Sequence, residues 1–178
     1  MRGLLNLTVS ELKLFLREPA AAFFTLAFPL ILLFVFGSAF GNDLSPSYAD
    51  GRWGPVDVMV QGYIGLIIGT IVFIGMPVTI SNYRQFGILK RLRATPVTAA
   101  TIVTAQVLVN LLMFVLGVVL LLVAGSIVFG LRMPEDMLGM WAAATLSFLS
   151  FAAVGLLLAS LFPGSRTAQA VGSAIFFP

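Results

Sequence analysis

The sequence predicts an all-α protein, built as a polytopic bundle of transmembrane helices. Hydrophobic residues make up 60% of the 178 residues and charged residues only 10%, whereas a soluble globular chain carries about 25% charged residues. The charges are also clustered, which leaves long uncharged stretches between them. So few charges cannot coat a chain of 19.0 kDa with a water-facing surface. Most of the surface is therefore expected to face lipid.

The apolar stretches read as helices and not as the strands of a barrel. Residues 116–123 are apolar throughout, whereas the strands of a membrane barrel alternate between apolar and polar residues. A helix satisfies its own backbone hydrogen bonds inside lipid. A cleaved signal peptide is an alternative for the first stretch, but that stretch exceeds the roughly 7–15 apolar residues of a signal sequence.

An interfacial helix is expected to precede the first span. Over residues 4–18, Leu5, Val9, Leu12 and Leu16 share one helix face, as in helices that lie along a membrane surface.

Each long uncharged stretch is then sized against the roughly 20 residues that a helix needs to cross a bilayer. The third stretch is longer than one crossing, and its threonine-rich first part, residues 94–104, is predicted to lead into the span. The last stretch is too short to cross and reads as the start of a fifth span. The expected spans are about 20–41, 58–82, 105–129 and 138–161, with 167–178 as a partial fifth.

Orientation follows from the lysine and arginine residues in the loops. The loops 43–57 and 132–136 lie on one side of the membrane and hold only Arg52 and Arg132. The other side holds the remaining eight basic residues, and it also holds the N-terminus. Because basic loops stay inside, the sequence predicts a multi-pass protein of the cell membrane with a cytoplasmic N-terminus.

The spans carry no clear ionisable residue. Ion-coupled carriers need carboxylates or histidines at membrane depth, so the energy for transport is expected to come from outside the spans. Gln106 and Asn110 are four residues apart and share a helix face. They are candidates for lining a substrate path or for contacts between helices. Pro29 and Pro77 are predicted to kink their helices, either as hinges or as fixed bends.

A basic amphipathic segment lies between the second and third spans. Within residues 84–93, one arc of a helix is covered by Phe86, Ile88, Leu89 and Leu92, and the other by Arg84, Lys90 and Arg91. Arg93 breaks this pattern, because it falls between Leu89 and Phe86 and is expected to mark the end of the helix. Taken alone, this pattern fits a helix on the lipid surface. The alternative is a lever that docks in a cytoplasmic partner.

Several runs of the chain resemble the permease subunits of the ABC type-2 exporter family. They are residues 17–19 (Arg-Glu-Pro), residues 28–30 (Phe-Pro-Leu), and the most specific run, residues 83–96, in which a tyrosine-arginine pair precedes a glycine and a basic leucine stretch. The resemblance implies that this last region contacts an ATP-binding subunit. The implied contact residues are Arg84, Gln85, Gly87, Lys90, Arg91 and Arg93. Many relatives have glutamate where this chain has Gln85.

The resemblance also implies the organisation and function. Relatives have six spans, so residues 1–178 are expected to be a single transmembrane domain that is incomplete at its C-terminus. The expected function is that of a permease subunit of an ATP-driven exporter of drug-like, lipid or other amphipathic molecules. Its expected partners are the ATP-binding subunit, a second permease chain and the bilayer. The alternative is a non-transporting membrane scaffold that recruits a cytoplasmic protein.

Several classes of chemistry are excluded by what the sequence lacks. It has no cysteine and no histidine, which removes thiol chemistry and histidine metal sites. No P-loop motif is present, because neither Lys13 nor Lys90 follows a glycine. The chain is therefore expected not to be an enzyme and to hold no cofactor, with ATP and magnesium bound by the partner. A nucleic-acid role is not expected for residues 90–93, because this segment is tethered at the bilayer and lacks stacking aromatics beyond Phe86.

Overall fold

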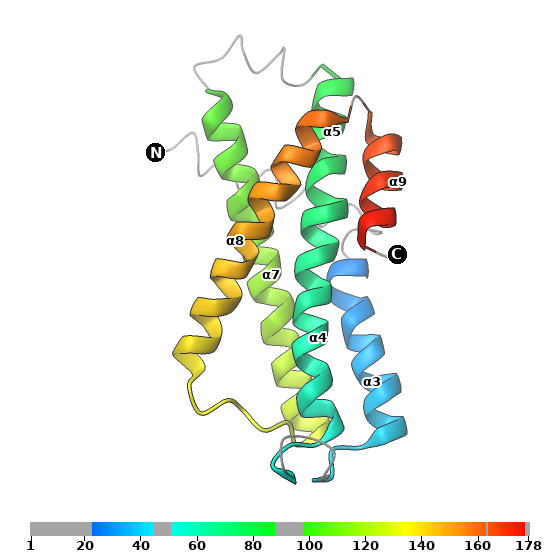
Figure 1. Ribbon diagram of the computed structural model, residues 1–178, viewed down its shortest axis with the longest axis vertical. Coiled ribbons are helices and arrows are strands. Elements are labelled where there is room, and N and C mark those ends of the chain that lie inside the picture. The colour runs from blue at the N-terminus through cyan, green and yellow to red at the C-terminus, as the bar shows by residue number, and fades with distance from the viewer. Residues whose placement is uncertain (1–22, 45–50, 88–97, 163, 177–178) are drawn as a thin grey trace.

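The computed structural model describes residues 23–44, 51–87, 98–162 and 164–176 as a helical bundle (Figure 1). All of the regular secondary structure in these ranges is helical, which confirms the predicted fold class. The elements in chain order are η1 (Phe23–Ala27), α3 (Phe28–Phe40), α4 (Pro55–Gly69), η3 (Thr70–Gly75), α5 (Met76–Gln85), α7 (Ala99–Phe129), α8 (Met137–Leu161) and α9 (Ser165–Phe176).

Four continuous helical stretches are long and apolar enough to cross a membrane. Their bounds are Phe23–Phe40, Pro55–Gln85, Ala100–Phe129 and Met137–Leu161. The second begins three residues before the predicted start. Residues 99–104, predicted to lead into the third span, already belong to α7, which Thr98 caps by accepting a hydrogen bond from the Thr101 N–H. The first span is described only from Phe23, and the predicted interfacial helix 4–18 lies outside the described residues.

The helix α9 occupies the position of the predicted partial fifth span. Its 12 residues rise about 18 Å, which is shorter than the hydrocarbon core of a bilayer. It packs beside α5 and η3, and the ring of Phe176 stacks on Phe73 with centroids 6.3 Å apart.

The bundle has two ends, which are named here by their charged residues. At the Asp57 end, α3 and α7 finish while α4 and α8 begin (Figure 1). At the Arg84 end, α5 and α8 finish while α7 and α9 begin. The packing follows a similar division. The helix α4 contacts mainly α3 and α7, while α5 contacts mainly α8 and α9.

The interior is apolar and closely packed. Phe114 and Phe148 are both fully buried and stack with ring centroids 5.2 Å apart, and Leu33, Ile67 and Met76 are buried in the same cluster. The outward faces of the same helices are also apolar, as at Ile127 and Leu161, whose exposed fractions are 78% and 72%. Apolar groups on both faces are what a bundle surrounded by lipid requires.

A π-helical segment precedes each of the two prolines predicted to bend the spans. The segment η1 ends just before α3, where Pro29 stands in the first turn. The segment η3 ends just before α5, where Pro77 stands in the first turn. Proline lacks the N–H that an α-helix needs at that position, so each span changes its hydrogen-bond pattern ahead of its proline. Whether the axes bend there by a large angle stays a prediction.

Candidate functional site

The helix α5 ends inside the segment expected to contact an ATP-binding subunit. The Phe86 N–H donates to the Asn82 carbonyl at 2.9 Å, and the Gly87 N–H donates to the Arg84 carbonyl at 3.1 Å. Gly87 has φ +66°, in the left-handed region, which glycine enters without steric cost. A left-handed glycine after the last helical residue is a common way to stop a helix. Gly87 therefore fixes where α5 stops and where the chain turns away.

Arg84 binds the end of another span. Its guanidinium donates from Nη1 to the Ser160 carbonyl at 3.3 Å and from Nη2 to the Ala159 carbonyl. These carbonyls lie in the last turn of α8, where no further N–H of the helix reaches them. A positive charge at a helix C-terminus is also favourable to the helix dipole. Arg84 thus ties the end of α5 to the end of α8.

Gln85 makes the next contact along the same segment. Its Oε1 accepts a hydrogen bond from the Ser165 hydroxyl at 3.3 Å, and Ser165 is the first residue of α9. Because the contact uses a side-chain oxygen, a glutamate at this position would offer an equivalent acceptor. Gln85 ties the end of α5 to the start of α9.

Phe86 was not among the predicted contact residues. It stands in the sequence between Gln85 and Gly87, and 67% of its surface is exposed. The other predicted contact residues, Lys90, Arg91 and Arg93, lie outside the described residues. The amphipathic helix predicted over 84–93 is described only as far as Gly87, and the rest stays a prediction.

Gln106 and Asn110 are both buried inside the bundle, with exposed fractions of 6% and 2%. The Asn110 amide donates to the backbone carbonyl of Gln106 at 2.8 Å, so this hydrogen bond lies within α7 and joins no second helix. Within the part of the chain that the structure describes, Gln106 Oε1 accepts no hydrogen bond.

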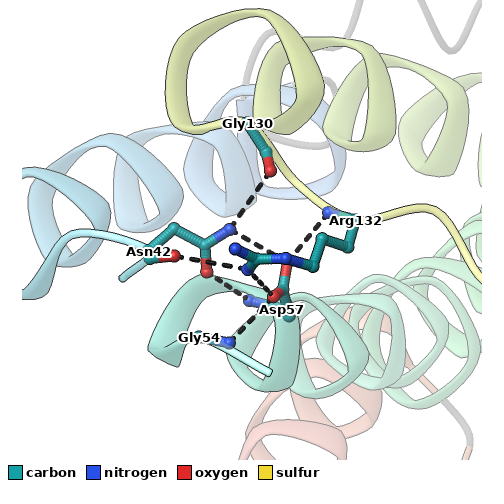
Figure 2. Close-up of polar contacts among 5 residues, drawn as sticks. All are labelled: Asn42, Gly54, Asp57, Gly130 and Arg132. Carbon is teal, nitrogen blue, oxygen red and sulfur yellow. Dashed lines mark hydrogen bonds and ion pairs between the residues drawn. The ribbon is translucent and has the colours of Figure 1, made fainter. Parts of the chain in front are cut away.

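A polar network at the Asp57 end was not predicted (Figure 2). The Asp57 side chain is fully buried, and its Oδ2 accepts a hydrogen bond from the Gly54 N–H at 2.9 Å, which caps α4. The guanidinium of Arg132 donates to the same Oδ2 at 2.8 Å, and the Arg132 backbone N–H donates to Oδ1 at 2.9 Å.

Asn42 completes this network from the end of α3. Its amide donates to Asp57 Oδ1 at 3.0 Å, and its side-chain oxygen accepts from the Asp57 N–H at 3.2 Å. Its backbone carbonyl accepts from the Arg132 guanidinium at 3.3 Å. The network therefore joins the end of α3, the start of α4 and the segment after α7.

The prediction that Asp57 belongs to the loop 43–57 is wrong, because α4 begins at Pro55. A signal for this start exists in the sequence. Gly54-Pro55 followed by an acid at position 57 places proline in the first turn and a carboxylate where it reaches the backbone N–H of the capping residue. No comparable signal relates Asp57 to Arg132, since the two are 75 residues apart.

The chain was compared with protein families, curated proteins and solved structures. No curated protein and no solved structure matches the chain. The family model described as ABC-2 type transporter matches residues 2–178, a range that includes all four spans and the end of α5. The chain therefore belongs to the ABC-2 type transporter family, as a membrane component of such a transporter.

Proposed function

We propose that the chain is the permease subunit of an ATP-driven exporter, driven by a separate ATP-binding subunit that docks on residues 84–93. The observation that carries this proposal is the double tether at the end of α5. Arg84 holds the end of α8 and Gln85 holds the start of α9. A force applied to this one segment therefore reaches three helices at once.

The location of the tethers fits a docking site. The chain leaves α5 at Gly87 with the exposed ring of Phe86 beside the turn. The basic residues Lys90, Arg91 and Arg93 follow within six residues. By the distribution of lysine and arginine, this end of the bundle faces the cytoplasm, where ATP is available.

A substrate with a large apolar surface suits the spans best. The polar side chains buried in α7, Gln106 and Asn110, are amides without charge. Drug-like molecules, lipids and other amphipathic compounds are therefore the proposed cargo, and two permease chains would enclose the pathway. ATP and magnesium would be bound by the ATP-binding subunit.

The test is co-purification of the chain with the ATP-binding subunit encoded beside it, followed by measurement of ATP hydrolysis in nanodiscs. Arg91→Ala is expected to lower the stimulated ATPase rate at least five-fold. Arg52→Ala is the matched control, because Arg52 lies at the Asp57 end, and it is expected to change the rate less than two-fold. Equal rates in wild type and Arg91→Ala would contradict docking through this segment.

The orientation has a separate test, which uses the absence of native cysteine. Ser47→Cys and Lys90→Cys are treated in intact cells with a membrane-impermeant thiol reagent. Labelling at position 47 alone is expected. Labelling at position 90 alone would place the proposed docking segment on the wrong side of the membrane. Binding of the ATP-binding subunit with no ATP-dependent transport of any tested amphipathic compound would favour the scaffold function.

A further inference from the structure

The segment η3 interrupts the hydrogen-bond pattern of the second span near its middle. The Met76 N–H donates to the carbonyl of Ile71, five residues before it, where an α-helix would use the carbonyl of Val72. Pro77 has no N–H to donate. The Val72 carbonyl therefore lacks the donor that residue 77 would supply in a π-helix. The Phe73 carbonyl lacks the donor that residue 77 would supply in an α-helix.

These two carbonyls face a glycine of α8 and a glycine of α9. A Cβ placed on Gly155 of α8 would lie 2.5 Å from the Val72 oxygen, and one on Gly172 of α9 would overlap the Phe73 oxygen. Both obstacles are backbone atoms, which cannot rotate away as a side chain does. Only glycine lets α8 and α9 approach the segment this closely, in the way that small residues allow close helix packing in membranes.

The two sides of η3 belong to different groups of helices. The first group, α3, α4 and α7, is held together at the Asp57 end by the network of Asn42, Asp57 and Arg132. The second group, α5, α9 and the end of α8, is held together at the Arg84 end by Arg84 and Gln85. The segment η3 is the continuous backbone that connects the groups inside one span.

We infer that η3 is a joint that switches between the π pattern and the α pattern and so turns the second group relative to the first. In the switch, the Met76 N–H leaves the Ile71 oxygen for the neighbouring Val72 oxygen, so the number of backbone hydrogen bonds is unchanged. A shift of one residue corresponds to a rotation of about 100° and a translation of about 1.5 Å in the helix that follows. π-Segments inside α-helices are frequent at functional sites.

The force that turns the joint is the one part of this inference that rests on the proposed function. A push from an ATP-binding subunit on residues 84–87 is delivered to α5, and η3 is the first place where α5 can turn without carrying α4 along. The helices α8 and α9 follow because they are tethered to α5 and seated on the carbonyls of η3.

The experiment measures distances between spin labels in the chain, in nanodiscs, with labelled chains diluted in unlabelled ones so that each pair lies within one molecule. Ile127→Cys with Leu161→Cys spans the joint, from α7 to the end of α8. Phe40→Cys with Ile127→Cys lies within the first group. All three positions are exposed. With the ATP-binding subunit present, the change in mean distance between nucleotide-free and ATP-trapped samples is expected to be at least twice as large for the pair that spans the joint.

Pro77→Ala supplies the missing N–H and favours the α pattern. It is expected to at least halve the change in the spanning pair. Pro55→Ala is the matched control, because a proline in the first turn of α4 replaces an N–H that has no partner in the helix, and it is expected to leave the change intact. Equal changes in both label pairs, or an unaltered change in Pro77→Ala, would overturn the joint while leaving the docking of the ATP-binding subunit in place.

The joint can also be judged if no ATP-binding subunit binds. In the chain alone, Pro77→Ala is then expected to narrow or shift the distance distribution of the spanning pair relative to wild type, with no effect on the pair within the first group. An identical distribution in wild type and Pro77→Ala would exclude the joint. A changed distribution without any binding of the subunit would support the joint and contradict the proposed function.

Discussion

Asp57 and Arg132 are joined by two hydrogen bonds, one from the Arg132 guanidinium at 2.8 Å and one from its backbone N–H at 2.9 Å. The carboxylate is fully buried, while 41% of the Arg132 side chain is exposed. The pair is therefore asymmetric. If Arg132 is lost, the buried Asp57 carboxylate keeps its hydrogen bonds from Gly54 and Asn42. If Asp57 is lost, all of these donors lose their shared acceptor.

This asymmetry predicts the order of two substitutions at the Asp57 end. Asp57→Ala is expected to lower the free energy of unfolding by about 3 kcal/mol, because buried donors lose their acceptor. Arg132→Ala is expected to cost about 1.5 kcal/mol, the value of a hydrogen bond to a charged group. Denaturant unfolding in micelles measures both. Glu135→Ala, an exposed neighbour, is the control and is expected to change stability by less than about 0.5 kcal/mol.

The double variant tests whether the pair acts as one unit. If the two side chains depend on each other, Asp57→Ala combined with Arg132→Ala costs about as much as Asp57→Ala alone. Strict addition of the two single effects would contradict this coupling.

Arg84 is expected to stabilise the chain itself, apart from any docking. Arg84→Ala removes the donors to the last turn of α8 and is expected to raise amide hydrogen exchange over residues 157–161, with a loss of about 1 kcal/mol in local stability. Arg84→Lys is expected to give an intermediate effect, because one ammonium replaces a forked guanidinium. Unchanged exchange in Arg84→Ala, measured against Arg166→Ala as the control, would exclude the tether.

Gly87 and Gly62 are expected to respond to alanine with opposite signs. Gly87→Ala forces a side chain into the left-handed region and is expected to cost about 1 kcal/mol at the end of α5. Gly62 lies within α4, and a Cβ added there would meet no atom within 4 Å, so Gly62→Ala is expected to add about 0.5 kcal/mol through helix propensity. Thermal unfolding of both variants in one detergent gives the comparison. A stabilising Gly87→Ala would show that α5 continues past this residue.

Gly155 is expected to be far less tolerant than Gly65, although both lie within long helices. Gly155→Ala places a methyl group against the Val72 carbonyl and is expected to cost about 1–3 kcal/mol through forced backbone shifts. Gly65→Ala meets no atom within 4 Å and serves as the matched control. The measurement is the fraction of folded chain after extraction at increasing temperature, and equal tolerance of the two variants would contradict the close packing of α8 on η3.

The long apolar stretches were sufficient to predict the class of fold and the approximate positions of the long apolar helices. Hydropathy is a property of local sequence, so the end of α7 at Phe129 and the body of α8 could be placed from the run of apolar residues alone. The start of α4 was missed because Asp57 looks like a solvated loop charge when only hydropathy is considered. Its burial depends on Arg132 and Asn42, and no local pattern announces that partnership.

Part of the candidate site was also accessible from the sequence. The run 83–96 led to Arg84, Gln85 and Gly87, all of which lie at the end of a span. The partners of Arg84 could not be predicted from the sequence, because the carbonyls of Ala159 and Ser160 are backbone atoms that any residue supplies. The contacts of Gly155 and Gly172 with η3 could not be predicted for the same reason, because they too are made with backbone carbonyls. The need for glycine at position 155 comes from the Val72 carbonyl, which lies far away in the chain and is left without a donor by Pro77.

The separation of Asp57 from Arg132 has a consequence for biosynthesis. The carboxylate emerges from the ribosome long before its arginine, and at about 5–20 residues per second the intervening 75 residues take roughly 4–15 s to make. During that interval the Asp57 carboxylate has only the hydrogen bonds from Asn42 and from the Gly54 N–H to stabilise it near the lipid. A nascent chain halted before position 132 would therefore present the hairpin of α3 and α4 to the insertion machinery without the ion pair at Asp57. Synthesis of Arg132 would complete the network.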